Sequence, residues 1–502
     1  MLPRELLHTL VRCSARSPVR SFSASTRRSN VVKELEVRGM LSELTSRAGR
    51  KHVDKPTTVY LGVDPSAKSL HVGNLLALIG LLHFRLQGHN AVALIGGATG
   101  AIGDPSGRST ERNALAPEAL AANVEGITKQ LTAFLDRGVE FAQSRTRRRD
   151  GKEVEKTAEG SVRIVNNLDW LGGVSLLEFL STVGKMARVS TMLSRESVKS
   201  RLDSSSGLSF TEFSYQLLQA YDFLRLHRDL GCTMQLGGSD QLGNIVSGID
   251  MIRRDNLNRA AVKAEDGNVK EKEEEDPAFG LTFQLLTTAS GEKFGKSAGN
   301  AVWLDPSMTS PFEVYQFFLR TADDEVERYL KIFTFIRVIE LEGIMHDHKA
   351  NPKNRIAQKV LAAEATELIH GAEGLRQALA ATDVFYSADL ASRGDLSSLI
   401  TALDASPSSS TSSTAVPIPS LITRLPKQDH LNQSLEKIVL ASGLLASKTQ
   451  ARKAIESGTI QLNGQRIPPK SHQRMIGEGD LLDGKLLVLK AGKSVHRAVV
   501  ME

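Results

Sequence analysis

Cysteine is nearly absent from this sequence, because Cys13 and Cys232 are the only two thiols in 502 residues. Two thiols cannot form a disulfide framework and are too few for a thiolate metal site, so we predict no protein-bound metal. Long apolar runs are also missing. The longest, around residues 74–84, falls short of the roughly 18 residues that a membrane-spanning helix needs. The sequence therefore predicts a soluble protein of about three domains, without a membrane partner.

Net charge is low, at +6, but it is unevenly distributed along the chain. Residues 1–30 carry +5 and residues 431–502 carry another +5, which leaves −4 for the residues between them. The basic excess therefore lies at the two ends, and each end needs its own explanation.

Residues 1–30 are rich in Arg and Ser, and Leu6, Leu7 and Leu10 group on one side of a short helix. This composition is typical of an amphipathic mitochondrial transit peptide, whereas a secretory signal would have a continuous apolar core. A disordered basic tail is the alternative. We therefore expect a protein of the mitochondrial matrix.

The C-terminal end is organised as a separate module. Residues 387–430 include a Ser/Thr/Pro-rich run that cannot bury enough apolar surface to order itself, which indicates a linker. In residues 431–502, two short helices precede an Asn-Gly hairpin. Lys448, Arg452 and Lys453 share one face of the second helix, which favours a nucleic-acid backbone over a merely solvated face. The order of these elements resembles the small α+β RNA-binding domain of the S4 type.

Strands and helices alternate in the middle of the chain. A β-branched strand at residues 57–63 leads into a helix at 71–86, and an apolar strand at 91–95 leads into a glycine-rich loop. This alternation predicts an α/β fold with a doubly wound, Rossmann-like parallel sheet over residues 31–304, whose ligands bind at the carboxyl ends of the strands. Neither a G-x-G-x-x-G motif nor a P-loop follows a strand, which disfavours both of those nucleotide folds. Apolar residues at helical spacing predict an all-helical domain at residues 305–386.

Two polar motifs suit phosphate binding. The segment HVGN at residues 71–74 begins a helix, where unpaired N–H groups and the helix dipole favour an anion. The segment KFGKS at residues 293–297 lies in a polar loop, and its two lysines can reach toward a triphosphate. Alone, the first would more often be an ordinary helix start and the second an exposed turn.

A third candidate is the helix at residues 213–226. Its polar residues Tyr215, Gln219 and Asp222 fall within about 60° of one another around the helix axis. Such a narrow stripe either lines a site or forms the wet side of an amphipathic helix. Periodicity alone leaves both interpretations open.

HVGN and KFGKS, about 220 residues apart, together resemble the HIGH and KMSKS signatures of class I aminoacyl-tRNA synthetases. The resemblance extends to longer segments, in the order and spacing of bacterial-type tyrosyl-tRNA synthetases. They are YLGVDPSAKSLHVGN, GGATGAIGDPSGRSTER, NNLDWL, SYQLLQAYDFLRL and QLGGSDQLGNI. The match covers residues 33–304. With the transit peptide and the terminal RNA module, the chain looks like a mitochondrial member of that family.

The resemblance implies a catalytic domain that activates tyrosine with ATP and Mg²⁺ to tyrosyl-adenylate, releasing pyrophosphate. The tyrosyl group would then pass to the 3′-terminal adenosine of tRNA(Tyr). Neither step needs a protein nucleophile or a strong base, so catalysis would rest on positioning and charge stabilisation. The helical domain would face the anticodon side, and the region following Asn166 resembles the family's dimer segment, which implies a homodimer.

The resemblance also implies roles for individual residues. Contacts near the reacting phosphates fall to His71, Asn74, Lys293, Lys296 and Ser297. The tyrosine pocket would comprise Tyr60, Asp104, Tyr215, Gln219, Asp222, Gln235 and Gln241. The nucleotide would contact Gly62, Asp64, Ser66, His71, Asn74, Gly237, Asp240 and Lys296. Contacts with tRNA are implied for Arg108, Arg112, Asn167 and Trp170, in addition to Lys448, Arg452 and Lys453.

Within that pocket, Asp222 and Tyr60 would hydrogen-bond the phenolic hydroxyl, and Asp104, Tyr215 and Gln219 would hold the ammonium. Phenylalanine would leave buried polar groups unpaired, which can reject it by roughly 10⁴ to 10⁵ without an editing site. The signatures depart from the family pattern at three residues. Asn74 replaces the second His of HIGH, and Phe294 and Gly295 replace Met and Ser of KMSKS, for which we expect an altered rate rather than an inactive enzyme.

Two other functions compete with this interpretation. A tryptophanyl-tRNA synthetase shares the fold and the signatures, but QLGGSDQ, the Tyr60 and Asp222 pairing and the terminal RNA module argue against it. An RNA-binding or intron-splicing factor is the alternative of another class, because some fungal mitochondrial relatives take on that role. A basic run at residues 145–149 soon becomes mixed in charge, and residues 263–276 hold seven acids against three lysines, which should repel RNA. Intron RNA is therefore kept only as a second partner to be tested.

Overall fold

The computed structural model describes residues 30–104, 115–150, 159–202, 207–263, 276–286, 301–386, 400–401, 403, 420–492 and 495–502. The described residues divide into two compact units. The first, here called the sheet unit, comprises the described residues within 30–304 and 322–357. The second, here called the C-terminal unit, consists of Asp305–Thr321 and Gln358–Glu502. Residues 305–386 contain helices, as their periodicity predicts, but these are shared between the two units.

A six-stranded sheet forms the centre of the sheet unit, in the order β1-β6-β5-β2-β3-β4. Its strands are β1 (Leu41–Leu44), β2 (Thr58–Val63), β3 (Asn90–Ile95), β4 (Val162–Asn166), β5 (Cys232–Gly238) and β6 (Phe279–Phe283). Neighbouring strands are parallel except β1 and β6, which pair antiparallel. The predicted Rossmann-like parallel sheet is thus confirmed, with one antiparallel strand added at its edge.

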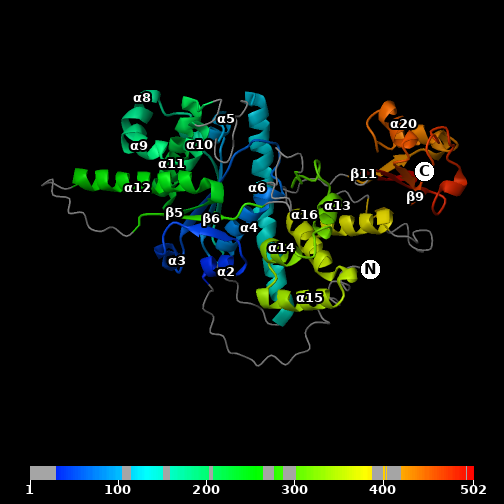
Figure 1. Cartoon of the computed structure of the whole chain (residues 1–502), viewed down its shortest axis with the longest axis horizontal. Helices are drawn as coiled ribbons and strands as arrows, with labels where there is room; N and C mark the ends of the chain where they lie inside the picture. The colour runs from blue at the N-terminus through cyan, green and yellow to red at the C-terminus, as the bar shows by residue number, and fades with distance from the viewer. Residues whose placement is uncertain are drawn as a thin grey trace. The chain divides into compact units, whose positions relative to one another are not determined.

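Helices connect the parallel strands and cover both faces of the sheet. Helix α4 (Val72–Leu86) follows β2, and α5 (Thr99–Ile102) and α6 (Pro117–Asp150) follow β3. In Figure 1, α11 (Phe210–Leu230) and α12 (Leu242–Lys263), in green, lie on one side of β5 and β6, whereas α2 (Val31–Val37) and α3 (Ala48–His52), in blue, lie on the other. Burial on both faces explains why β3 and β6 are almost entirely apolar.

The strand order reverses at β2, which has β3 on one side and β5 on the other. In open parallel sheets such a reversal leaves a crevice at the carboxyl ends of the strands, where ligands bind. Between β4 and β5 the chain forms a series of short helices before the long α11. They are α7 (Leu168–Leu171), α8 (Leu176–Phe179), η1 (Leu180–Gly184), α9 (Val189–Leu193) and α10 (Glu196–Leu202).

The N-terminal helix α2 begins at Asn30, the last residue of the predicted transit peptide. The Asn30 side-chain oxygen accepts hydrogen bonds from the backbone N–H groups of Val32 and Lys33, which caps the helix. Its amide nitrogen donates to the backbone oxygen of Arg50 and to Asp54. Val31 and Val32 are fully buried, so α2 packs into the unit from its first turn.

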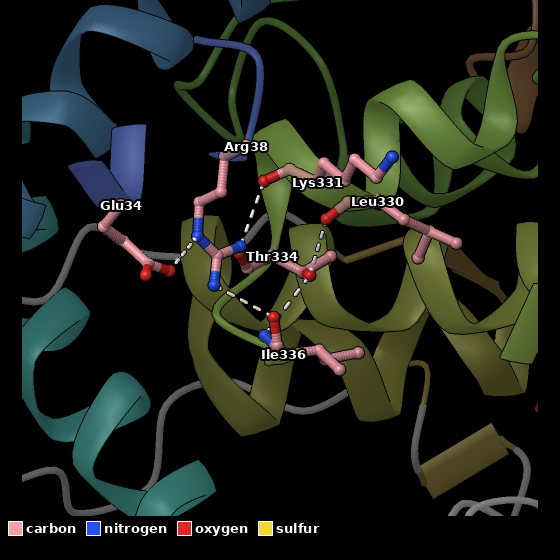
Figure 2. Close-up of polar contacts among 6 residues, drawn as sticks. All are labelled: Glu34, Arg38, Leu330, Lys331, Thr334 and Ile336. Atoms are coloured by element: carbon pink, nitrogen blue, oxygen red, sulfur yellow. Dashed lines mark hydrogen bonds and ion pairs between the residues drawn. The ribbon is translucent and has the colours of Figure 1, made fainter. Parts of the chain in front are cut away.

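Arg38, directly after α2, joins this helix to a distant turn of the same unit. Figure 2 shows its guanidinium facing the end of α14 (Val326–Phe333), where it donates to the backbone oxygens of Lys331 at 3.0 Å, Thr334 at 2.8 Å and Ile336 at 3.0 Å. Its Nε donates to Glu34 at 2.7 Å. The last carbonyls of a helix lack partners within the helix and carry partial negative charge. Arg38 supplies hydrogen-bond donors and also a compensating positive charge. The turn that it contacts connects α14 with α15 (Val338–Ala350).

The C-terminal unit combines helices with a second, five-stranded sheet in the order β7-β11-β10-β8-β9. Its helices are α13 (Pro311–Leu319), most of α16 (Ile356–Tyr386), α18 (Lys427–His430), α19 (Leu435–Ala441) and α20 (Lys448–Glu456). The strands are β7 (Ile422–Leu425), β8 (Ile460–Leu462), β9 (Gln465–Arg466), β10 (Leu486–Ala491) and β11 (Val495–Met501). As expected, two helices precede an Asn-Gly hairpin, in which Asn463 and Gly464 both have positive φ angles. Part of the expected linker at residues 387–430 is structured, because Ile422 and Leu425 are buried where β7 pairs with β11.

We predict that Arg38→Met lowers the free energy of unfolding by about 3 kcal/mol, because it leaves buried carbonyls without a donor. Urea denaturation monitored by circular dichroism measures the change. Arg50→Met is the matched control. Arg50 forms an exposed ion pair with Glu36, so its replacement is expected to cost less than about 1 kcal/mol. Equal losses in the two variants would contradict the proposed weight of the Arg38 contacts.

Candidate active site

Asp222 lies at the centre of the polar groups that gather over the sheet. It belongs to α11 and is 2% exposed. The indole nitrogen of Trp170 donates to its Oδ1 at 2.8 Å, and the side-chain nitrogen of Asn167 donates to its Oδ2 at 2.9 Å. Burial raises the pKa of Asp222 to about 7, although these two hydrogen bonds act in the opposite direction.

Asn167 and Trp170 were expected near the acceptor end of tRNA. Their polar groups instead face Asp222, and Asn167 is fully buried at the end of β4. A side chain without exposed surface cannot contact a tRNA strand, so the structure argues against that role for Asn167. Both residues orient a buried carboxylate.

The hydroxyl of Tyr60 is buried and has no hydrogen-bond partner within the described residues. Tyr60 lies on β2 in register with Gln235 on β5, and the buried Oε1 of Gln235 also lacks a described partner. Burial, together with the charge of Asp222, raises the pKa of Tyr60 well above its usual value, so its hydroxyl stays protonated and can donate. Native proteins leave few buried polar groups unpaired, so these two atoms indicate a place for a polar ligand.

A second carboxylate, Asp64, follows β2 at the same end of the sheet. The hydroxyl of Tyr215 donates to its Oδ2 at 3.1 Å, and the hydroxyl of Thr99 donates to its Oδ1 at 3.2 Å. Thr99 also accepts a hydrogen bond from Asn167 at 3.0 Å, so it connects the surroundings of Asp64 with those of Asp222. Thr99 was not predicted from the sequence: its place after the Gly96-Gly97 turn that follows β3 indicates a position near the strand ends but not its partners.

A chain of side-chain amides leads to a third carboxylate, Asp104. Gln241 donates to Asp104 Oδ2 at 2.7 Å, and Gln219 donates to Gln241 Oε1 at 3.1 Å. Gln219 shares the predicted polar stripe of α11 with Tyr215 and Asp222, both of which are buried. The stripe therefore faces the interior, and the wet-side interpretation does not hold.

His71 and Asn74 form the capping box of α4. His71 Nδ1 accepts from the backbone N–H of Gly73 at 3.0 Å, and Asn74 Oδ1 accepts from the backbone N–H of His71 at 3.1 Å. Burial lowers the pKa of His71, which favours the neutral ring. Because Nδ1 is an acceptor, the neutral ring carries its proton on Nε2, where it can donate to a ligand.

Gly62 marks open space near this helix start. It belongs to the central strand β2 and yet is exposed, and a Cβ atom placed there would meet nothing within 4 Å. At the end of β5, a Cβ on Gly238 would lie 2.8 Å from Asp240 Oδ1, and a Cβ on Gly237 would lie 2.9 Å from the Cβ of Gln241. Glycine at these positions therefore permits a close approach of the backbone to the two side chains. Ser66 follows in the turn after β2, where its N–H donates to the Asp64 backbone oxygen.

The chain segment that follows KFGKS returns to the start of α4. The backbone N–H of Val72 donates to Val302 at 2.9 Å, and that of Leu304 donates to Leu70 at 2.8 Å. The ring centroids of Trp303 and His71 are 5.9 Å apart. These contacts bring the end of the loop close to the HVGN motif.

Several predicted residues lie outside the described part of the chain. They are Arg108, Arg112, Lys293, Lys296 and Ser297, together with residues 1–29 of the expected transit peptide, residues 151–158 after the basic run and residues 264–275 of the acidic segment. In the C-terminal unit, Lys448, Arg452 and Lys453 are exposed on α20, whereas Ala451 and Ile455 of the same helix are buried. Arg452 also pairs with Glu456 at 3.0 Å.

Within the described ranges, no helix is long and apolar enough to cross a membrane. The same ranges contain no group of three His, Cys, Asp or Glu side chains that could hold a metal ion.

The parallel sheet, the HVGN motif at the start of α4 and the carboxylates at the strand ends together define a class I aminoacyl-tRNA synthetase. The family model for class I tRNA synthetases (W and Y) matches residues 51–387, and the model for the tyrosine–tRNA ligase SYY-like C-terminal domain matches residues 418–499. The chain therefore belongs to the tyrosine–tRNA ligase family of class I synthetases.

Individual relatives agree with this assignment. The chain is 39% identical over 475 residues to the tyrosine–tRNA ligase of Opitutus terrae, covering 93% of this chain and 99% of the relative. It is 46% identical over 353 residues to the mitochondrial tyrosine–tRNA ligase of Rattus norvegicus, covering 70% of this chain and 69% of the relative. The solved structure of the C-terminally truncated mitochondrial tyrosyl-tRNA synthetase of Coccidioides posadasii matches with a TM-score of 0.60 and 38% identity, covering 70% and 92%. These relatives are tyrosine–tRNA ligases, so the tryptophan alternative is not supported.

We predict that Trp170→Phe loses more stability at pH 8.5 than at pH 5.5, by about 1 kcal/mol. In the folded protein Asp222 is charged above about pH 7, and the Trp170 hydrogen bond lowers its pKa. Loss of that bond raises the folded pKa further, while Asp222 in the unfolded chain is ionised at both pH values. The added loss therefore develops as the pH rises through about 7.

Urea denaturation at the two pH values measures this difference. Tyr221→Phe is the control, because Tyr221 precedes Asp222 on α11 and packs against Phe179 instead. Its effect on the free energy of unfolding is expected to be the same at both pH values. A Trp170→Phe loss that does not change with pH would contradict the assigned hydrogen bond.

Proposed function

We propose that this chain activates L-tyrosine with ATP to tyrosyl-adenylate and transfers the tyrosyl group to the terminal adenosine of a mitochondrial tRNA(Tyr). The observation that carries the proposal is the buried hydroxyl of Tyr60, which has no hydrogen-bond partner among the described residues and whose pKa is raised by burial and by the nearby charge of Asp222. The Tyr60 hydroxyl can donate a hydrogen bond, and the Asp222 carboxylate can accept one. A phenolic hydroxyl, which both accepts and donates, satisfies the two together.

Specificity for tyrosine follows from the free-energy cost of leaving the Tyr60 hydroxyl and the Asp222 carboxylate without the hydrogen bonds of a phenolic hydroxyl. Phenylalanine would occupy the same apolar walls, including the ring of Phe223, whose centroid is 5.2 Å from that of Tyr60. It would leave the Tyr60 hydroxyl and the Asp222 carboxylate without partners in a buried site. A site built to bond a hydroxyl rejects the analogue without it by roughly 10⁴ to 10⁵.

The ammonium of tyrosine would lie among Asp104, Tyr215 and Gln219. A carboxylate offers about four acceptor sites, so the bond from Gln241 to Asp104 does not exclude an ammonium partner. The Tyr215 hydroxyl donates a hydrogen bond to Asp64. The lone pairs of the Tyr215 oxygen therefore point away from Asp64 and can accept from the ammonium. Gln235 would complete the pocket through its unpartnered Oε1.

ATP would bind over the open surface at Gly62, with its ribose near Asp240. The Nε2–H of His71 and the side-chain amide of Asn74 would donate to the phosphates, aided by the N–H groups at the start of α4. The substrate carboxylate attacks the α-phosphorus, and pyrophosphate leaves from the opposite side. We assign Lys293, Lys296 and Ser297 to the developing pyrophosphate. The hydrogen bond between Val302, a few residues after them in the chain, and Val72 of α4 supports this assignment.

Mg²⁺ would arrive with the nucleotide, held by its phosphates, and no residue is assigned to it. The tRNA would contact Arg108 and Arg112 near the site, and the exposed basic face of α20 in the C-terminal unit. The basic composition of residues 1–30 and the mitochondrial relatives support a location in the mitochondrial matrix.

The proposal predicts that tyrosine, but not phenylalanine, supports ATP–pyrophosphate exchange. Tyr60→Phe should lower the ratio of kcat/KM for tyrosine to that for phenylalanine by about tenfold, the effect of one lost hydrogen bond. Tyr329→Phe, a buried tyrosine of α14 in the same unit, should leave the ratio unchanged. Equal use of both amino acids by the wild type would refute the pocket assignment.

We also propose that the chain forms a homodimer through the short helices between β4 and α11. Large apolar side chains gather on this stretch and are exposed: Leu168, Leu176, Leu177, Leu180, Val189 and Phe210. Exposed apolar side chains concentrated in one segment suggest an interaction site in a soluble protein. A second copy of the same face would cover it, and twofold symmetry would then make the contact close on itself.

Leu177→Glu is expected to shift the protein from dimer to monomer at micromolar concentration, because it would bury an unpaired carboxylate in the proposed interface. Sedimentation velocity measures the mass. Ile339→Glu is the matched control, since Ile339 of α15 is 71% exposed and Leu177 is 79% exposed. A dimer that persists in Leu177→Glu, or dissociates equally in Ile339→Glu, would contradict the assigned face.

A further inference from the structure

Asn244 contacts the chain of amides that leads to Asp104. It lies in the first turn of α12 and is 6% exposed. Its side-chain nitrogen donates to Gln219 Oε1 at 2.9 Å and to Gln241 Oε1 at 3.3 Å. One amide group from α12 therefore bridges a residue of α11 and a residue of the turn η2 (Ser239–Gln241).

The orientation of the three side-chain amides is fixed by the Asp104 carboxylate, at which this series of hydrogen bonds ends. An ionised carboxylate only accepts, so Gln241 must present its nitrogen to Asp104 and its oxygen to Gln219. Gln219 must then present its own nitrogen to Gln241. The Gln219 oxygen consequently faces Asn244, which has to supply a donor. Reversing any one amide would place two acceptors or two donors against each other.

We infer that Asn244 is a positioning residue for the substrate ammonium. It holds Gln219 and Gln241 so that every amide donates toward Asp104. Acceptor oxygens of Gln219 and Asp104 are thereby kept in place before a cation binds. This inference rests on the proposed function, because it assigns the ammonium of tyrosine to these two side chains.

Asn244 acts through orientation and not through charge. A ligand binds more tightly when its partners are already held in the bound geometry, because less conformational entropy is lost on binding. Hydrogen bonds connected in series within a buried site also strengthen one another. The benefit concerns only the cationic end of the substrate. The phenolic end would lie with Tyr60 and Asp222 instead.

Two variants separate orientation from charge. Asn244→Leu keeps the approximate shape of the side chain and removes the donor, so Gln219 and Gln241 lose a shared partner. Asn244→Asp keeps the shape, removes the donor and adds an acceptor. It therefore forces Gln219 to turn its nitrogen away from Gln241. A simple charge effect would make Asn244→Asp bind a cation more tightly, whereas the loss of amide order makes it bind more weakly.

The test compares tyrosinol, which carries the ammonium, with 3-(4-hydroxyphenyl)propan-1-ol, which lacks it and is otherwise the same. Dissociation constants for the full-length protein are measured by isothermal titration calorimetry. We expect Asn244→Leu to weaken tyrosinol binding about fivefold and Asn244→Asp at least about tenfold. Binding of the amine-free alcohol should change less than about twofold. Ser247→Ala, which loses a hydrogen bond one turn further along α12, should affect neither ligand.

The outcomes divide clearly. Selective loss of tyrosinol binding in both variants supports the inference. An equal loss for both ligands indicates a purely structural residue, and tighter tyrosinol binding by Asn244→Asp indicates a charge effect, so either result overturns it. Failure of the proposed function itself would be seen separately, as a wild type that supports no tyrosine-dependent exchange or does not prefer tyrosinol to the alcohol.

Discussion

The burial of the Asp222 carboxylate is the constraint on which the arrangement of the site depends. Removing a charge from water is costly unless the protein supplies donors in its place. Here Asn167, at the end of β4, and Trp170, in α7, supply one donor each. The end of β4, the short helix after it and the middle of α11 must therefore meet at one point. That meeting point lies at the carboxyl end of β4.

The rest of the pocket is organised mainly by hydrogen-bond direction. Thr99 connects Asp64 with Asn167, and three amides lead toward Asp104. Such connected polar groups specify one arrangement of side chains, since each donor needs its acceptor in a low-dielectric setting. Only Tyr60 and Gln235 keep an unpaired buried atom among the described residues of this network. These two atoms are the ones that the proposed function assigns to the substrate.

The sequence predicted the parallel sheet because alternation of apolar strands and helices is a local property, visible in residues 57–95. It also predicted the stripe on α11, but helical periodicity could not say whether that stripe faces water or the sheet. Asn167, Thr99 and Asn244 could not be placed from the sequence, because each role depends on a partner at least 20 residues away or in another element. The structured part of the expected linker was missed for a similar reason. Residues 422–425 form a strand only because β11, far along the chain, pairs with them.

The contact between Arg38 and the turn after α14 has a consequence for how the protein is made. The guanidinium and its acceptor carbonyls are separated by 293 to 298 positions along the chain. A polypeptide that leaves the ribosome, or enters an organelle, with its amino end first presents this arginine long before its acceptors. The contacts between Arg38 and the turn after α14 cannot all form until residue 336 is available. This region can therefore complete its folding only after more than half of the chain has emerged.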